Sequence, residues 1–214
     1  MRSVLLGMFL LMLIAPAATA QTGKHLALGG AVGLTHYIDK DFSSRNPGFS
    51  IAYRFRLNPE SKEGWSWAPR SGLGWSNRKT STDIGGTRTQ LGKLQTILIM
   101  AGVQRKLRQG PWQLGMGVVA GGSINHFEVD RAARDAYQNR LGLALTEIKV
   151  KNSIAIRPEV GAWYDLSEWF ALHGSVSYLF NRPKAETTLG GVTTSSTWKT
   201  DHASVSVGLV VGVF

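Results

Sequence analysis

The chain has 214 residues, with 24 lysines and arginines against 14 aspartates and glutamates, and it has no cysteine. Without cysteine there can be no disulfide, no lipid anchor on an N-terminal cysteine and no thiolate metal site. A net charge of +10 suits anionic partners, but the export signal described next argues against nucleic acid, and we expect none.

The first 20 residues have the layout of a secretory signal peptide. Arg2 precedes an apolar run over residues 4–14, and small residues at positions 18–20 end the segment. The apolar run is shorter than the roughly 20 residues that a membrane-spanning helix needs. We therefore expect residues 1–20 to be a signal peptide and residues 21–214 to form one exported domain.

Alternation with a period of two predicts strands that have one large apolar face and one small or polar face. In one such strand Phe49, Ile51 and Phe55 alternate with small residues and arginines. In chain order the pattern occupies residues 26–35, 49–57, 112–121, 153–164, 170–180 and 204–213, with weaker strands near residues 67–79 and 93–106. About eight strands is the number found in the smallest outer-membrane barrels.

Long and short links alternate between these strands. The long links are residues 39–45, 80–90, 129–151 and 181–201, and the short ones are residues 58–65, 108–111 and 165–168. An up-and-down barrel with both termini in the periplasm has loops at one rim and tight turns at the other. The predicted fold is therefore all-β, an antiparallel up-and-down transmembrane β-barrel. A soluble lipocalin-like barrel would show the same alternation with its faces reversed.

Aromatic residues gather near the ends of the predicted strands. Beside the short turns lie Trp65, Trp67, Trp112, Tyr164 and Trp169, and near the long loops lie Tyr37, Phe127, Phe180 and Trp198. Amphipathic rings favour the headgroup level of a membrane, so two interface girdles are predicted. The alternative is that they are ordinary core aromatics.

With this pattern the chain resembles the small OmpA- and OmpX-like outer-membrane barrels. The most specific element is the last strand, which ends in Phe214 and is similar to the terminal aromatic read by the barrel-insertion machinery in that superfamily. The resemblance implies an outer-membrane location, contact with outer-membrane lipid, and the insertion machinery as a partner during biogenesis. Two features depart from the pattern: Phe214 has the opposite parity to the apolar face of its strand, and Pro158 lies inside a predicted strand.

Several charged residues share the parity of the small residues, which in a membrane barrel is the lumen. They are Arg54, Arg56, Arg70, Arg78, Arg157 and Glu159. Unpaired charge in a dry interior is costly, so the lumen should hold water, anions or carboxylates from the rims, such as Asp165 and Glu128. One interpretation is a solvated polar plug that holds the barrel rigid. The other is an anion-preferring conduit or a site for an anionic ligand.

No catalytic, cofactor-binding or metal-binding residue is assigned. Three histidines could lie near the outer rim, but no recognisable serine or acid signature surrounds them. His126 and Glu128 share one strand face, which suits a metal pair or a polar lumen pair. Residues 130–145 could form a short helix on the outer side.

The predicted function is non-enzymatic: a structural, anchoring or adhesive role through the outer loops, with an unidentified extracellular partner. A small anion-favouring channel through the arginine-lined lumen is the first alternative. A lipid A-modifying enzyme and a secreted lipocalin-like carrier follow it.

Overall fold

A computed structural model describes residues 26–38, 48–57, 63–68, 70–167 and 169–213. The predicted signal peptide, the link at residues 39–45 and Phe214 lie outside these residues. Among the described residues, no helix is long and apolar enough to cross a membrane.

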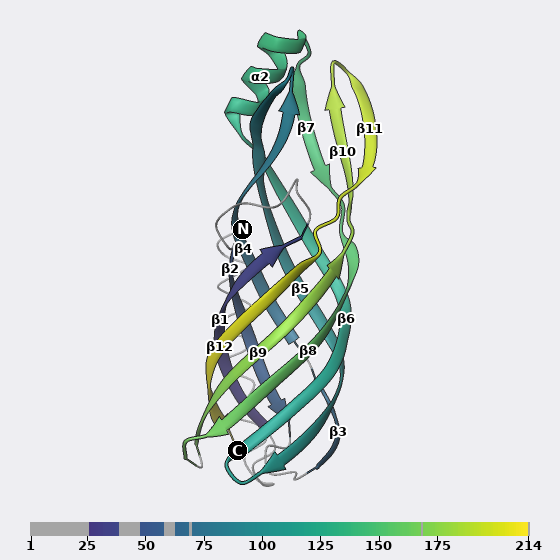
Figure 1. Ribbon diagram of the computed structural model, residues 1–214. Helices are drawn as coiled ribbons and strands as arrows, with labels where there is room; N and C mark the ends of the chain where they lie inside the picture. The colour runs from purple at the N-terminus through teal and green to yellow at the C-terminus, as the bar shows by residue number, and fades with distance from the viewer. Residues whose placement is uncertain (1–25, 39–47, 58–62, 69, 168, 214) are drawn as a thin grey trace.

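The wall of the molecule is one antiparallel sheet that curls until its two edges meet (Figure 1). Its strands are β1 (Leu26–Tyr37), β2 (Gly48–Leu57), β3 (Glu63–Trp67), β4 (Arg70–Ile84), β5 (Thr87–Gln109), β6 (Trp112–Val129), β8 (Ser153–Asp165), β9 (Phe170–Asn181) and β12 (His202–Val213). Strand β12 pairs with β1 and closes the wall. The register of β3 on β5 continues into the first part of β4, from Arg70 to Trp75, so β3 and β4 form two parts of one wall strand. The described chain is therefore a closed barrel of eight strands, as predicted.

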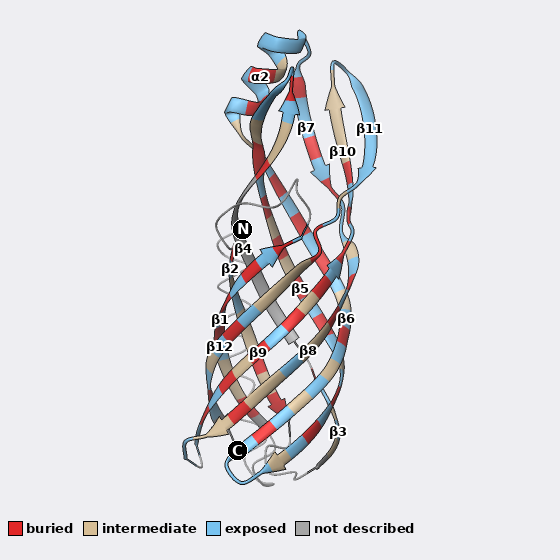
Figure 2. Cartoon of the chain, in the orientation of Figure 1, coloured by how far each residue is buried: buried red, intermediate tan, exposed pale blue. Residues whose placement is uncertain are grey.

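The two faces of each wall strand meet different surroundings, and Figure 2 shows the resulting alternation of buried and exposed residues. On β12, Val205, Val207 and Leu209 are exposed on the outside, while Ser206 is buried. The large apolar face therefore points outward, as expected of a barrel surrounded by lipid and opposite to a soluble lipocalin.

The exposed apolar side chains form a band around the barrel. On β6 the band begins at Trp112 and ends at Ile124. At about 3.3 Å per residue and a tilt of about 40°, this part of β6 spans roughly 30 Å along the barrel axis. That is close to the apolar band of about 25 Å that outer-membrane barrels present to lipid.

Pro158 lies in β8, where it leaves a local gap in the ladder. The β8–β9 pairs run from Ala155 to Ile156 and resume at Glu159, while the β6–β8 register continues through Pro158. A proline cannot donate a ladder hydrogen bond, and the closed wall accommodates this loss by a short interruption on one side.

The barrel has one end with tight turns and one end with a folded extension. At the first, Gln109 pairs with Trp112 across a two-residue turn, and Leu26 of β1 pairs with Val213 of β12. We call it the turn end. At the other, strands β4, β5 and β6 continue beyond the rest of the wall (Figure 1).

The extension contains regular structure where the sequence predicted loops. Residues 80–90 form a hairpin of β4 and β5, turned by Gly85 and Gly86 at φ 57° and 77°. Such left-handed conformations are what a two-residue hairpin turn requires, and glycine adopts them freely. The link at residues 129–151 contains α2 (Arg131–Leu141) and β7 (Leu145–Val150), and the link at residues 181–201 contains β10 (Lys184–Leu189) and β11 (Val192–Thr197). The prediction of loops was wrong for the strands of these segments. In β10 and β11 most side chains are polar, and in β7 the buried residues Leu145, Ile148 and Val150 do not follow strict period-two alternation.

The extension has an apolar core of its own. Its buried members include Leu91, Leu94 and Phe127 from the barrel strands, Ala133 from α2, and Ile148 and Ala185 from the sheet β11-β10-β7. The helix lies in the region where a short helix was predicted. Its N-cap is Asp130, whose carboxylate accepts from the Ala132 N–H, and its C-cap is Gly142 at φ 65°. Burial raises the pKa of the Tyr137 hydroxyl on the same helix above its ordinary value.

Candidate functional site: the polar lumen

The turn-end half of the lumen is filled by side chains around Arg56. Its Nη1 lies 2.5 Å from Asp165 Oδ1, and its Nε donates to Gln113 Oε1 at 2.7 Å. The guanidinium carbon lies 5.3 Å from the ring centroid of Trp163. Arg108 binds the other oxygen of Asp165 at 2.9 Å. Because Arg56 is only 3% exposed, its charge is compensated by protein groups in place of water.

The ring of Trp163 continues this packing into the middle of the barrel. It lies 4.0 Å, centroid to centroid, from the ring of His173 on β9. Both residues, with Gln104 and Glu159, line a cavity of about 10 Å³, which is room for about one water molecule. This half of the lumen is therefore a packed polar interior.

Arg54 and Glu159 form the central ion pair of the lumen. Arg54 Nη1 lies 3.0 Å from Glu159 Oε2, and Nη2 donates to Ser175 Oγ at 3.0 Å and to Ser206 Oγ at 2.8 Å. The Nε of Arg157 lies 3.8 Å from the same Glu159 oxygen. Four strands, β2, β8, β9 and β12, are thereby tied together across the interior.

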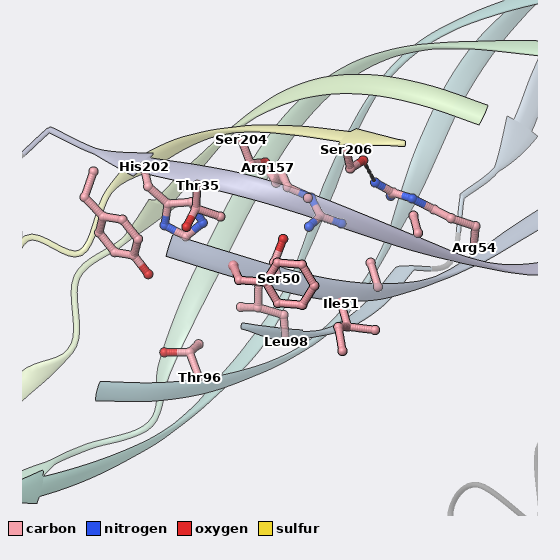
Figure 3. Close-up of a pocket in the computed structure, with 15 residues that line it drawn as sticks. Thr35, Ser50, Ile51, Arg54, Thr96, Leu98, Arg157, His202, Ser204 and Ser206 are labelled. Atoms are coloured by element: carbon pink, nitrogen blue, oxygen red, sulfur yellow. Dashed lines mark hydrogen bonds between the residues drawn. The ribbon is translucent and has the colours of Figure 1, made fainter. Parts of the chain in front are cut away.

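A larger cavity opens between this ion pair and the extension. It measures about 40 Å³ and is shown in Figure 3. Its polar lining consists of Thr35, Tyr37, Ser50, Arg54, Thr96, Arg157, His202, Ser204 and Ser206. At the end toward the extension, the rings of Tyr37 and His202 stack with centroids 4.2 Å apart.

Charged side chains of both signs lie inside the described part of the barrel. The buried cations are Arg54, Arg56, Lys106 and Arg157, and the carboxylates facing them are Glu159 and Asp165. The sequence analysis did not name Lys106 as a lumen residue, although it lies at the end of the predicted strand 93–106; it is 2% exposed. Its parity with Gln104, another buried residue of β5, would have placed it in the lumen.

Some predicted lumen residues lie elsewhere or cannot be placed. The side chains of Arg70 and Arg78 lie outside the described residues, although their backbones belong to β4. The prediction of Glu128 as a rim partner and of a lumen pair with His126 was wrong, because both residues are exposed on β6. The parity that turns Leu114 outward on this strand also turns His126 and Glu128 outward. Among the described residues, no three acidic or histidine side chains are grouped so as to hold a metal ion.

The aromatic residues predicted to lie at the turn-end interface remain on the outer surface. Trp65 and Trp67 of β3 are 72% and 68% exposed. Trp112, Tyr164 and Trp169 lie at the same end, and the rings of Trp112 and Tyr164 are 4.7 Å apart. They occupy the edge of the apolar band, where amphipathic rings suit the headgroup level.

The second predicted girdle is only partly on the surface. Phe180 is exposed, but Tyr37 and Phe127 are buried in the extension core, and Trp198 packs edge-on against Phe127 at 5.1 Å. The girdle prediction was wrong for these three because the extension covers the strand ends that carry them.

Comparison with known proteins gives likeness in structure alone. No family model matches the chain, and no curated protein sequence matches it. The outer membrane protein OprG from Pseudomonas aeruginosa superimposes with a TM-score of 0.68 over 87% of this chain and 94% of its own, at 13% identity. Neisserial surface protein A superimposes with a TM-score of 0.54 over 88% of this chain and 97% of its own, also at 13% identity. The outer membrane protein AlkL, solved in lipid bilayers, superimposes with a TM-score of 0.53 over 93% of this chain and 95% of its own, at 15% identity.

The chain has the fold of the small outer-membrane β-barrels. This barrel presents an apolar band to its surroundings and buries Arg54, Arg56 and Arg157 in its interior, as a lipid environment favours. This fold and the outward apolar band agree with the expected location in the outer membrane.

Proposed function

We propose that this barrel is a non-enzymatic anchor that holds a folded extension at the membrane surface for a structural or adhesive role. The observation that carries the proposal is the apolar core of the extension, in which α2 and three additional strands pack on the prolonged barrel strands. A connecting loop needs no such core, whereas a surface that must keep its shape to contact a partner does.

The hairpin of β10 and β11 offers a test of this role. Among the strands that the structure describes, it pairs only with β7, outside the barrel wall, and Ala185 is its fully buried contact with the extension core. We expect that replacing residues 184–197 by a short Gly-Ser turn leaves the barrel folded, with its heat-dependent gel mobility intact. Attachment of cells to surfaces and resistance of the envelope to detergent should fall to the level of cells without the protein.

The matched control keeps the hairpin and changes only its exposed surface, with Thr193→Ser at a position paired with Thr188. This variant should behave like the wild type in both assays. If the wild type, the hairpin replacement and cells without the protein behave alike in both assays, the proposal has no support.

An anion-favouring channel is a second candidate, and the buried arginines that face the lumen favour it. The contacts of Arg56 and Arg54 oppose it, because they fill the lumen at two levels. We therefore expect the wild-type protein to give no unitary currents in a planar bilayer, whereas Arg54→Ala combined with Arg56→Ala should give them. Arg105→Gln, on the exposed face of β5, is the control and should stay silent. Anion-selective steps from the wild type that disappear in Arg54→Gln would favour the channel.

A further inference from the structure

We propose that the 40 Å³ cavity of the lumen binds a small free oxyanion of the size and charge of phosphate or sulfate. Two arginines reach this cavity, Arg54 from β2 and Arg157 from β8 (Figure 3). Guanidinium groups present a planar fork of N–H donors that matches the oxygens of such ions.

Hydroxyl groups line the same space beside apolar residues such as Leu98. Thr35 of β1, Ser50 of β2 and Ser204 of β12 come from different parts of the wall, and Thr96 of β5 also lines the cavity while its hydroxyl donates to Asn125 Oδ1. No described residue of the lining is a carboxylate. A hydroxyl can donate to an anion as well as accept, so this lining is suited to a ligand with several acceptor oxygens.

The charge balance at the cavity favours an anion. Glu159 Oε2 lies 3.0 Å from Arg54 and 3.8 Å from Arg157, so the two guanidiniums share this carboxylate. Arg54 and Arg157 are both buried, and attraction between opposite charges is strong in an interior of low dielectric constant. The two guanidiniums that reach the cavity would therefore attract an anion bound there.

The size and position of the cavity set the kind of ligand. A volume of about 40 Å³ has room for about three water molecules, or for one small oxyanion that replaces them. Toward the turn end the lumen is filled by Arg56, Asp165 and Gln113. The ion is therefore expected to bind from the extension side and not to pass through.

The site lies inside the wall, which distinguishes a free ion from the same chemistry on a lipid headgroup. Beside the cavity, β1 and β2 are paired continuously from Leu26 and Leu57 to Thr35 and Gly48. A headgroup tethered to acyl chains in the bilayer would have to cross this ladder. Short-chain phosphatidic acid is therefore a suitable probe for the lipid alternative.

The experiment is calorimetric titration of the full folded barrel in phosphate-free maltoside micelles with inorganic phosphate. Saturable binding of one ion per barrel is expected, and Arg157→Gln should weaken it at least tenfold. Arg134→Gln removes the same charge from the exposed surface of α2 and should leave the affinity unchanged. Ser50→Ala should weaken binding about threefold, and it serves as the test variant if Arg157→Gln does not fold.

Three outcomes would overturn the proposal. The wild type could show no saturable binding. The Arg134→Gln control could lose as much affinity as Arg157→Gln, which would indicate diffuse attraction to a basic protein. Finally, short-chain phosphatidic acid could bind where inorganic phosphate does not, which would assign the cavity to lipid. Loss of binding in Arg157→Gln or Ser50→Ala alone, in protein that keeps its heat-dependent mobility, supports the free-ion site.

Discussion

Replacing Glu159 by glutamine should lower the free energy of unfolding by about 3–5 kcal/mol, the range found when one partner of a buried ion pair is removed. Glu159 contacts Arg54 at 3.0 Å, and Arg157 lies 3.8 Å away. Glutamine keeps the shape but removes the charge, so two buried guanidiniums lose their shared carboxylate. Urea unfolding of the barrel in lipid vesicles, followed by tryptophan fluorescence and gel mobility, measures the effect.

A carboxylate in the extension provides the control. Glu147 is exposed on β7, and Glu147→Gln should change the free energy of unfolding by no more than about 0.5 kcal/mol. Replacing Arg54 and Glu159 together by leucine should cost less than the sum of the two single replacements, because no uncompensated charge of the pair then remains. If Glu159→Gln is as stable as the wild type, the ion pair does not hold the barrel together.

The barrel wall could be predicted from the sequence because lipid enforces strict alternation. Each wall strand faces lipid on one side and a polar interior on the other, so Val205, Val207 and Leu209 repeat at every second position. The extension lacks this constraint. Strand β11 is exposed along its whole length, and most residues of β10 are polar, so the pattern of this hairpin is typical of a loop. The pairs Gly85-Gly86 and Gly190-Gly191 were the available signals, since both are two-residue hairpin turns.

Parity predicted which charges face inward but not which of them meet. It placed Arg54, Arg56, Arg157 and Glu159 on one face, and each is buried or partly buried in the lumen. The partner of Arg56 lies 109 residues away, at Asp165. That contact depends on the stagger between strands on opposite sides of the barrel. Period-two alternation carries no information about the stagger, so the sequence suggested Asp165 as a rim partner but could not predict which arginine it contacts.

Replacing Gly121 by alanine should cost about 3 kcal/mol or more, at or above the upper end of the usual penalty for overpacking. A Cβ at this position of β6 would lie 2.1 Å from the carbonyl oxygen of Ile99 and 2.7 Å from Met100 Cα. Both are backbone atoms of the paired strand β5, which cannot rotate away as a side chain can. Gly102 on β5 is in the same position, with a Cβ 2.0 Å from the carbonyl oxygen of Val118. The inner face of this strand pair therefore requires glycine for close approach of the two backbones.

Replacing the neighbouring Gly122 is the control that distinguishes a steric requirement for glycine from an effect of backbone flexibility. Gly122 faces outward, and a Cβ added there meets nothing within 4 Å. Gly122→Ala should therefore leave the urea midpoint unchanged or raise it slightly, because alanine restricts the unfolded chain. Equal losses at positions 121 and 122 would show that both glycines act through conformational freedom. A large loss at position 121 alone would show that the approach of β5 to β6 sets the curvature of the wall, and with it the width of the lumen that Arg54, Arg56 and Glu159 fill.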